Sequence, residues 1–150
     1  MPDLRLRAPT DADLDILYAY QQDPQSYQMA AFPPRDREAF RTHWDKIRAD
    51  ETAIAQVIEL DGEVAGDIGS WEADGRREVG YWVGRAYWGR GIATAALRLV
   101  LERTPTRPLY AHVAVGNAGS IRVLEKCGFR RQGGPETAED GVELYLMMLR

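Results

Sequence analysis

The fold of this chain is decided by the stretch from Tyr81 to Leu97, which is Tyr-Trp-Val-Gly-Arg-Ala-Tyr-Trp-Gly-Arg-Gly-Ile-Ala-Thr-Ala-Ala-Leu. Its first part continues an alternation of apolar side chains that starts at Arg77 and predicts a strand. Its last part, from Ile92, has helical spacing and strong helix formers. The turn between them, residues 88–91, is rich in glycine. Because the first N–H groups of a helix lack partners and carry partial positive charge, this stretch predicts a phosphate-binding site.

Two common phosphate-binding patterns fit the stretch poorly. A P-loop requires Lys followed by Ser or Thr after its last glycine, and the frame that starts at Gly84 gives Arg90 and Gly91 there. A dinucleotide-binding loop requires a third glycine, replaced here by Thr94, and an acidic residue about twenty positions later, where His112 stands. Taken alone, the loop also fits an ordinary strand-to-helix turn.

A third pattern matches. The loop from Trp88 to Ala93 resembles the pyrophosphate loop of the GNAT superfamily of acyl-CoA-dependent N-acetyltransferases, in which Gly occupies the position of Gly91 and Gly or Ala the position of Ala93. Trp88 stands where Gln or Arg is commoner, as in the subgroup of ribosomal-protein N-terminal acetyltransferases. A second segment, residues 117–129, resembles the other well-marked segment of that family, at Asn117, Ser120, Leu124, Lys126, Gly128 and Phe129. Two motifs in this order, separated by one predicted strand, are far more specific than either alone.

The whole chain, residues 1–150, is expected to form a single α/β domain of the α+β type. Apolar periodicity and turn residues predict about four helices, at 10–21, 35–49, 91–102 and 117–126. They predict a mixed, mostly antiparallel sheet of about seven strands, at 4–8, 53–60, 64–71, 78–83, 109–115, 129–132 and 142–149. Residues 24–34 are expected to form an irregular link. The resemblance implies that the sheet splays open between the fourth and fifth strands, where the pantetheine arm of acetyl-CoA would insert.

The resemblance also implies how acetyl-CoA is bound. Trp82 and Val83 are expected to offer backbone groups to the pantetheine, and Asn117 to hydrogen-bond its cysteamine end. Asn is also among the best residues to cap a helix, and both roles are compatible. The loop residues expected to hold the pyrophosphate are Trp88, Gly89, Arg90, Gly91, Ile92, Ala93 and Thr94.

The chemistry implied is attack of an amine on a thioester, which requires a base and a proton donor for the leaving thiolate. Glu78 stands at a recurring base position of the family, and its plain alternative is an exposed carboxylate at a strand end. Many family members carry a Tyr acid four residues after the position of Ser120. Here that residue is Leu124, so Ser120 is the candidate donor. The backbone N–H near Val83 is the candidate contact for the thioester oxygen.

Three aromatic residues are candidates for contact with the amine, namely Tyr27, Phe32 and Tyr81, with core packing as the alternative. A covalent acyl-enzyme through Cys127 and His112 is disfavoured, because no third orienting group is visible. Two histidines and one cysteine give no metal-ligand set, so no metal is expected.

The composition of the chain limits the classes of partner that are expected. The net charge of −4 disfavours nucleic acid, and no apolar run approaches membrane-spanning length. A single cysteine suits a reducing compartment, and the chain is expected in the cytoplasm as a monomer or homodimer. The sequence therefore predicts an N-acetyltransferase that moves acetyl from acetyl-CoA to a protein N-terminus or a small-molecule amine by direct attack in a ternary complex. The missing Tyr acid leaves a non-catalytic acyl-CoA-binding module as the alternative.

Overall fold

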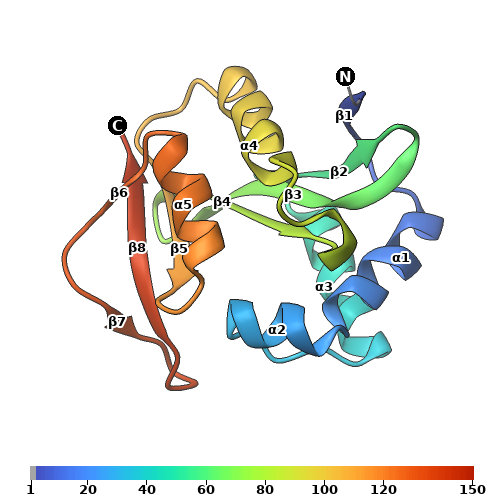
Figure 1. Ribbon diagram of the computed structural model, residues 1–150, viewed down its shortest axis with the longest axis horizontal. Helices are drawn as coiled ribbons and strands as arrows, with labels where there is room; N and C mark the ends of the chain where they lie inside the picture. Colours follow the sequence, from blue (N-terminus) through green and yellow to red (C-terminus); the bar gives the residue numbers. More distant parts are fainter. Residues whose placement is uncertain (1–2) are drawn as a thin grey trace.

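The computed structural model describes residues 3–150 (Figure 1), and residues 1 and 2, which the expected domain includes, lie outside that range. Eight strands form one mixed sheet in the order β1-β2-β3-β4-β5-β8-β6, with β7 paired to β8. The strands are β1 (Leu4–Arg7), β2 (Ile54–Leu60), β3 (Glu63–Ala73), β4 (Arg76–Val83), β5 (Leu109–Ala114), β6 (Arg130–Arg131), β7 (Glu136–Thr137) and β8 (Glu143–Leu149). The helices are α1 (Asp11–Gln21), α2 (Pro24–Ala30), α3 (Arg37–Ala49), the 3-10 turn η1 (Arg85–Tyr87), α4 (Ile92–Arg103) and α5 (Ala118–Lys126).

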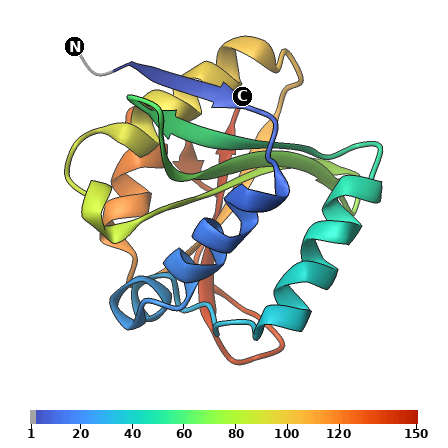
Figure 2. The ribbon, with the colours of Figure 1, turned by 90° about the vertical axis from the view of Figure 1, so that its right-hand side faces the viewer.

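Helices cover both faces of the sheet. The helices α1 and α3 lie on one face, and α4 and α5 lie on the other (Figure 2). A small apolar cluster joins the first pair to the sheet, made of Leu17, Phe40, Trp44, Val57 and Val64. The larger cluster under α4 and α5 includes Ile58, Ile68, Val79, Ile92, Leu97, Leu109, Ala111, Leu124 and Phe129. Each large apolar side chain fully buried in this way contributes about 1.5–3 kcal/mol, so both layers hold the sheet firmly.

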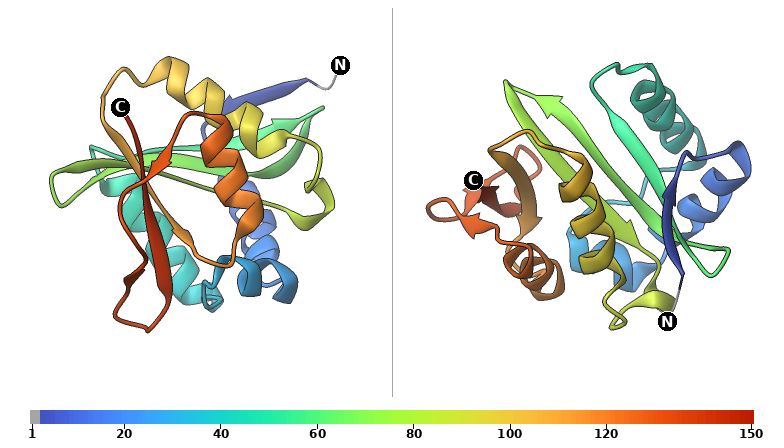
Figure 3. Two further views of the ribbon diagram at one scale, coloured as in Figure 1. Left: turned by 60° about the vertical axis from the view of Figure 1, so that its left-hand side comes forward. Right: turned by 90° about the horizontal axis from the view of Figure 1, so that it is seen from above.

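The sheet opens in the middle, as the resemblance implies. The strands β4 and β5 run parallel and pair only at Arg77 with Leu109 and at Glu78 with Tyr110. Beyond these pairs they diverge, as the view from above shows (Figure 3). The outer edge of β5 is then paired with β8 along its whole length, from Leu109 to Ala114. The backbone groups on the inner edge of β4 therefore face a gap instead of a neighbouring strand.

The structure adds elements to those expected. Within residues 3–150 there are eight strands and five α-helices, against about seven and about four. The expectation of an irregular link at 24–34 is wrong, because α2 occupies most of it. Asp23 caps this helix by accepting from Gln25 N–H, and Pro24 stands at a first-turn position, where its missing N–H costs nothing. The extra strand, β7, is a two-residue pairing in the expected loop 133–141.

Side-chain contacts fix α2 opposite the glycine loop. The Arg85 guanidinium of η1 donates to Asp23 and to Gln25, both at 2.6 Å. The Tyr20 hydroxyl at the end of α1 donates to the carbonyl oxygen of Val64 in β3. These contacts join the loop, the sheet and the start of α2 into one frame around the gap. Across residues 3–150, every helix is too short or too polar to cross a membrane.

Candidate active site

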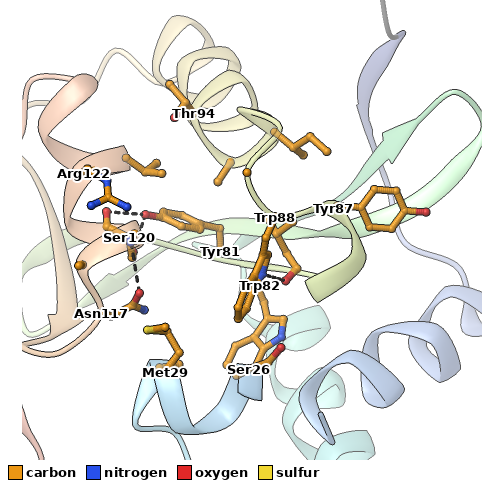
Figure 4. Close-up of a pocket in the computed structure, with 18 of the residues that line it drawn as sticks. Ser26, Met29, Tyr81, Trp82, Tyr87, Trp88, Thr94, Asn117, Ser120 and Arg122 are labelled. Carbon is orange, nitrogen blue, oxygen red and sulfur yellow. Dashed lines mark hydrogen bonds between the residues drawn. The ribbon is translucent and has the colours of Figure 1, made fainter. Parts of the chain in front are cut away.

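A cavity of about 590 Å³ opens where β4 and β5 diverge. Its volume falls in the range of small-molecule sites, about 300–1,000 Å³. The strand β4, the glycine loop, α5 and α2 form its walls (Figure 4). The lining residues are Ser26, Met29, Ala30, Tyr81, Trp82, Val83, Tyr87, Trp88, Gly89, Gly91, Ile92, Ala93, Thr94, Gly116, Asn117, Ala118, Gly119, Ser120, Arg122, Val123 and Lys126.

The glycine loop presents free backbone donors to this cavity. Gly89 and Gly91 have φ values of 74° and 73°, a left-handed conformation that only glycine adopts without strain. Gly91 is the N-cap of α4 and has no side chain to satisfy the first N–H groups of the helix. No acidic residue stands in the first turn of α4. The N–H groups of residues 92–94 are thus left for an anionic ligand, which the helix dipole also favours.

Trp88 has a structural part in the loop. Its indole N–H donates to the carbonyl oxygen of Val83 at 2.9 Å, which ties the loop back to the end of β4. The Ile92 side chain is buried in the core, so only its backbone is available to a ligand. The Arg90 guanidinium lies 5.6 Å from the Tyr87 ring centroid, and Arg90 does not line the cavity. Among the expected phosphate contacts, Arg90 is the one that the structure leaves outside.

Two cations that the sequence analysis did not assign to cofactor binding line the cavity instead. Arg122 and Lys126 lie one turn apart on α5. Their spacing of four residues puts them on one side of the helix. That spacing was visible in the sequence, but which side of α5 faces the loop is set by the tertiary packing.

The backbone N–H and C=O groups of successive residues in β4 point alternately toward the gap and toward the neighbouring strand β3. The Gly84 N–H donates to Ala65 of β3 at 2.8 Å, so the backbone groups of the preceding residue, Val83, point toward the gap. The Trp82 carbonyl oxygen lies against Gly66 of β3, where no Cβ would fit. Trp82 therefore contributes its indole to the cavity, and its carbonyl is directed away from it. The Trp82 ring packs edge-on against Phe32, with centroids 6.0 Å apart.

Tyr81 and Ser120 meet across the cavity. The Tyr81 hydroxyl lies 2.7 Å from Ser120 Oγ and 3.2 Å from the Ser120 carbonyl oxygen (Figure 4). Asn117 caps α5 by accepting from the Ser120 N–H. Burial raises the pKa of Tyr81 to about 12. Leu124, one turn after Ser120, is buried in the core. Tyr81, expected as a substrate contact, is thus a partner of the candidate proton donor.

Glu78 lies apart from the cavity, at the point where β4 and β5 still pair. His112 Nδ1, when protonated, donates to Glu78 Oε1 at 2.7 Å. The next residues along each strand, Val79 and Ala111, point into the core under α4, so Glu78 and His112 lie on the opposite face. Cys127 packs on the α4 side, where burial raises the pKa of its thiol. His112 and Cys127 are therefore separated by the sheet.

The two other expected substrate contacts differ in position. Phe32 is partly exposed beside Trp82, next to the cavity wall that α2 forms. Tyr27 lies in α2 but does not line the cavity, whereas its neighbour Ser26 does. Within residues 3–150, no three His, Cys, Asp or Glu side chains come close enough together to hold a metal ion.

Comparisons with known proteins agree with this geometry. Residues 3–130 match the model of a family described as acetyltransferase (GNAT) domain. The putative ribosomal N-acetyltransferase YdaF of Bacillus subtilis (strain 168) is 29% identical over 152 residues, which cover 93% of this chain and 81% of the relative.

Two solved structures share the fold. The spermidine N-acetyltransferase from Vibrio cholerae, in complex with CoA and spermine, superposes with a TM-score of 0.83 at 19% identity, over 97% of this chain and 94% of the other. Mycobacterium smegmatis RimJ, in complex with CoA-disulfide, gives a TM-score of 0.78 at 24% identity, over 97% and 81% of the two chains.

Proposed function

The chain belongs to the GNAT acetyltransferase family, and from this premise we propose that it acetylates a primary amine on a protein N-terminus or a small molecule. Family membership makes it an acetyl-CoA-dependent N-acetyltransferase. The proposal concerns the acceptor, the residues that act, and direct attack in a ternary complex. The relative named as a putative ribosomal N-acetyltransferase supports a protein N-terminus as the first acceptor to test.

The observation that carries the proposal is the uncapped start of α4 at the mouth of the gap between β4 and β5. When bound, acetyl-CoA supplies the acetyl group as an activated thioester. The N–H groups of residues 92–94 would bind its pyrophosphate, and Arg122 and Lys126 would neutralise its charge. The Val83 N–H in the gap would donate to the thioester oxygen, and Asn117 would orient the pantetheine.

The proton donor for the leaving thiolate is Ser120, held in place by Tyr81. Because the pKa of Tyr81 is raised to about 12, its phenol stays protonated and donates to Ser120 Oγ. The Ser120 hydrogen is then free to turn toward the cavity. The pair supplies from β4 and α5 together what a Tyr at position 124 would supply alone.

The acceptor amine reaches the thioester from the face of the sheet opposite α4 and α5. Glu78 lies on that face and is the proposed base, acting through His112, the group next to it. With its Nδ1–H hydrogen-bonded to Glu78, the His112 imidazole keeps Nε2 free to accept a proton from the amine or from a water. Phe32 and Trp82 would pack against the acceptor.

A second candidate function is a non-catalytic acyl-CoA-binding module. The observation that favours it is Leu124, which is buried in the core at the position of the usual Tyr acid. Both functions predict binding of acetyl-CoA, so only turnover distinguishes between them.

Binding and turnover are measured separately. Acetyl-CoA at about a hundred times its Kd should raise Tm by roughly 5–10 °C, with ATP as the control ligand. CoA release is then followed with a thiol reagent, using peptides with free N-termini and small amines as acceptors. Turnover that falls in Ser120→Ala but not in Ser120→Thr supports the proposed enzyme. A Tm shift without CoA release for any acceptor would leave the binding module as the function.

A further inference from the structure

The side-chain carboxylate of Asp67, in β3, makes no hydrogen bond or ion pair with any other residue within 3–150. Asp67 pairs in register with Val57 of β2 and with Trp82 of β4. Val57 is buried in the cluster beneath α1 and α3, so Asp67 points toward that same face of the sheet. This is the face on which the acceptor amine is proposed to bind.

The Asp67 carboxyl is partly buried, and this burial raises its pKa to about 7. Burying an ionised carboxylate without a partner is costly, so proteins normally provide one. Glu78, another carboxylate near the acceptor face, already has such a partner in His112. Asp67 has no such partner among residues 3–150, so its charge is left for a ligand.

Two further polar atoms on this face of the sheet also lack partners within residues 3–150. Among the described residues, the buried side-chain atoms without a hydrogen bond are Trp82 Nε1 and Gln21 Oε1. Trp82 is the register neighbour of Asp67, and Gln21 lies one turn after Leu17 on the side of α1 that packs on the sheet. Unsatisfied buried groups of this kind are uncommon and call for an explanation such as an absent ligand.

Two indoles lie close to Asp67 on this face of the sheet. The neighbouring cross-strand row is Ala55, Gly69 and Gly80, and the Trp71 ring covers Gly80, where an added Cβ would come within 2.8 Å of it. Across from Asp67 on β4 stands Trp82, whose indole packs against Phe32. An aromatic wall beside a carboxylate suits an ammonium group, which is attracted to both.

We propose that Asp67 binds a second positive charge of the acceptor, a cationic group other than the amine that is acetylated. This inference rests on the proposed function and narrows its substrate class to amines that carry an additional cation. Asp67 selects the acceptor and takes no part in the proton transfers, which belong to Glu78, His112, Tyr81 and Ser120. Its loss should therefore change the affinity for such an acceptor and leave the chemical step unchanged.

The test compares two amines of one chain length, 1,4-diaminobutane and 1-aminobutane, with the intact protein and with Asp67→Asn. Asn has nearly the same shape and removes only the charge. We expect Asp67→Asn to raise KM for the diamine about tenfold to a hundredfold, with kcat and the KM for acetyl-CoA within about twofold. The monoamine should be affected little. Asp74→Asn, in the exposed turn between β3 and β4, is the matched control.

The outcomes separate this inference from the proposed function. Equal KM values for the diamine in the intact protein and in Asp67→Asn overturn the inference and leave the proposed acetyltransferase function standing. If the intact protein releases no CoA with either amine or with peptides, the proposed function fails. In that case, calorimetric titration of 1,4-diaminobutane into the CoA-loaded protein tests whether Asp67 binds the diamine. Binding that weakens at least tenfold in Asp67→Asn supports the inference, and equal or absent binding in both proteins refutes it.

Discussion

Replacing Tyr81 with Phe should slow acetyl transfer about 5- to 30-fold and leave the KM for acetyl-CoA nearly unchanged. The change removes a hydroxyl that lies 2.7 Å from Ser120 Oγ and 3.2 Å from the Ser120 carbonyl oxygen. A neutral hydrogen bond contributes about 0.5–1.5 kcal/mol, so the phenol hydrogen, which lies near both oxygens, holds Ser120 by about 1–2 kcal/mol. Because 1.36 kcal/mol is a factor of ten in rate, this loss gives the stated range. The ring stays packed, so Tm should fall only about 2–4 °C.

The assay is a double-mutant cycle on the rate of CoA release at 25 °C. Ser120→Ala should cost about a hundredfold in kcat, as expected for loss of a proton donor. Tyr81 acts through Ser120, so the double variant should be no slower than Ser120→Ala alone. Tyr145→Phe, in β8, removes a phenol hydroxyl elsewhere and serves as the control. Effects of Tyr81→Phe and Ser120→Ala that multiply in the double variant would refute the proposed relay.

Three further predictions test other parts of the structure. Changing Arg122 and Lys126 to Gln should raise the KM for acetyl-CoA about 3- to 10-fold each and weaken its dependence on salt, and an unchanged KM would place the pyrophosphate elsewhere. Trp88→Phe, which loses the indole hydrogen bond to β4, should lower Tm by about 2–4 °C and raise the same KM, while an unchanged Tm would show that this bond does not order the loop. The pKa of Asp13 is lowered from 3.8 to about 2, first by its hydrogen bond from Arg7, so it stabilises the fold above about pH 4 and loses that effect as the pH falls toward 2. Urea unfolding at pH 6 and pH 2.5 should show this loss, of about 2 kcal/mol, in the intact protein but not in Asp13→Asn, and equal losses in both would exclude Asp13 as its source.

Local patterns in the sequence were enough to predict the elements that position the site. The alternation before Val83, the turn at Gly89 and Gly91, and the helical spacing from Ile92 each depend on neighbouring residues only. The expected splay between β4 and β5 is confirmed. The expectation of an irregular link at 24–34 misses α2, although Asp23 and Pro24 are residues typical of an N-cap and of the first turn of a helix.

The contacts that give the site its chemistry could not be read from spacing. Tyr81 and Ser120 stand far apart in the chain, and the angle at which α5 packs on the sheet decides that they meet. The same packing turns Arg122 into the cavity. Asp67 sits in a strand that the sequence predicts, but its lack of a partner depends on every element around it. Contacts of this kind can be known only from the tertiary structure.

The position of Leu124 explains why the proposed proton donor is shared between two elements. Ser120 and Leu124 lie one turn apart on the same side of α5, and Leu124 is fully buried with Phe129 in the core. A Tyr at 124 would have to be accommodated in that core, where overpacking costs about 1–3 kcal/mol. The phenol is supplied instead by Tyr81, from the wall that faces α5 across the gap. The same chemical group thus reaches the cavity from β4, and Ser120, at the edge of the core, is the residue of α5 that we propose passes its proton on.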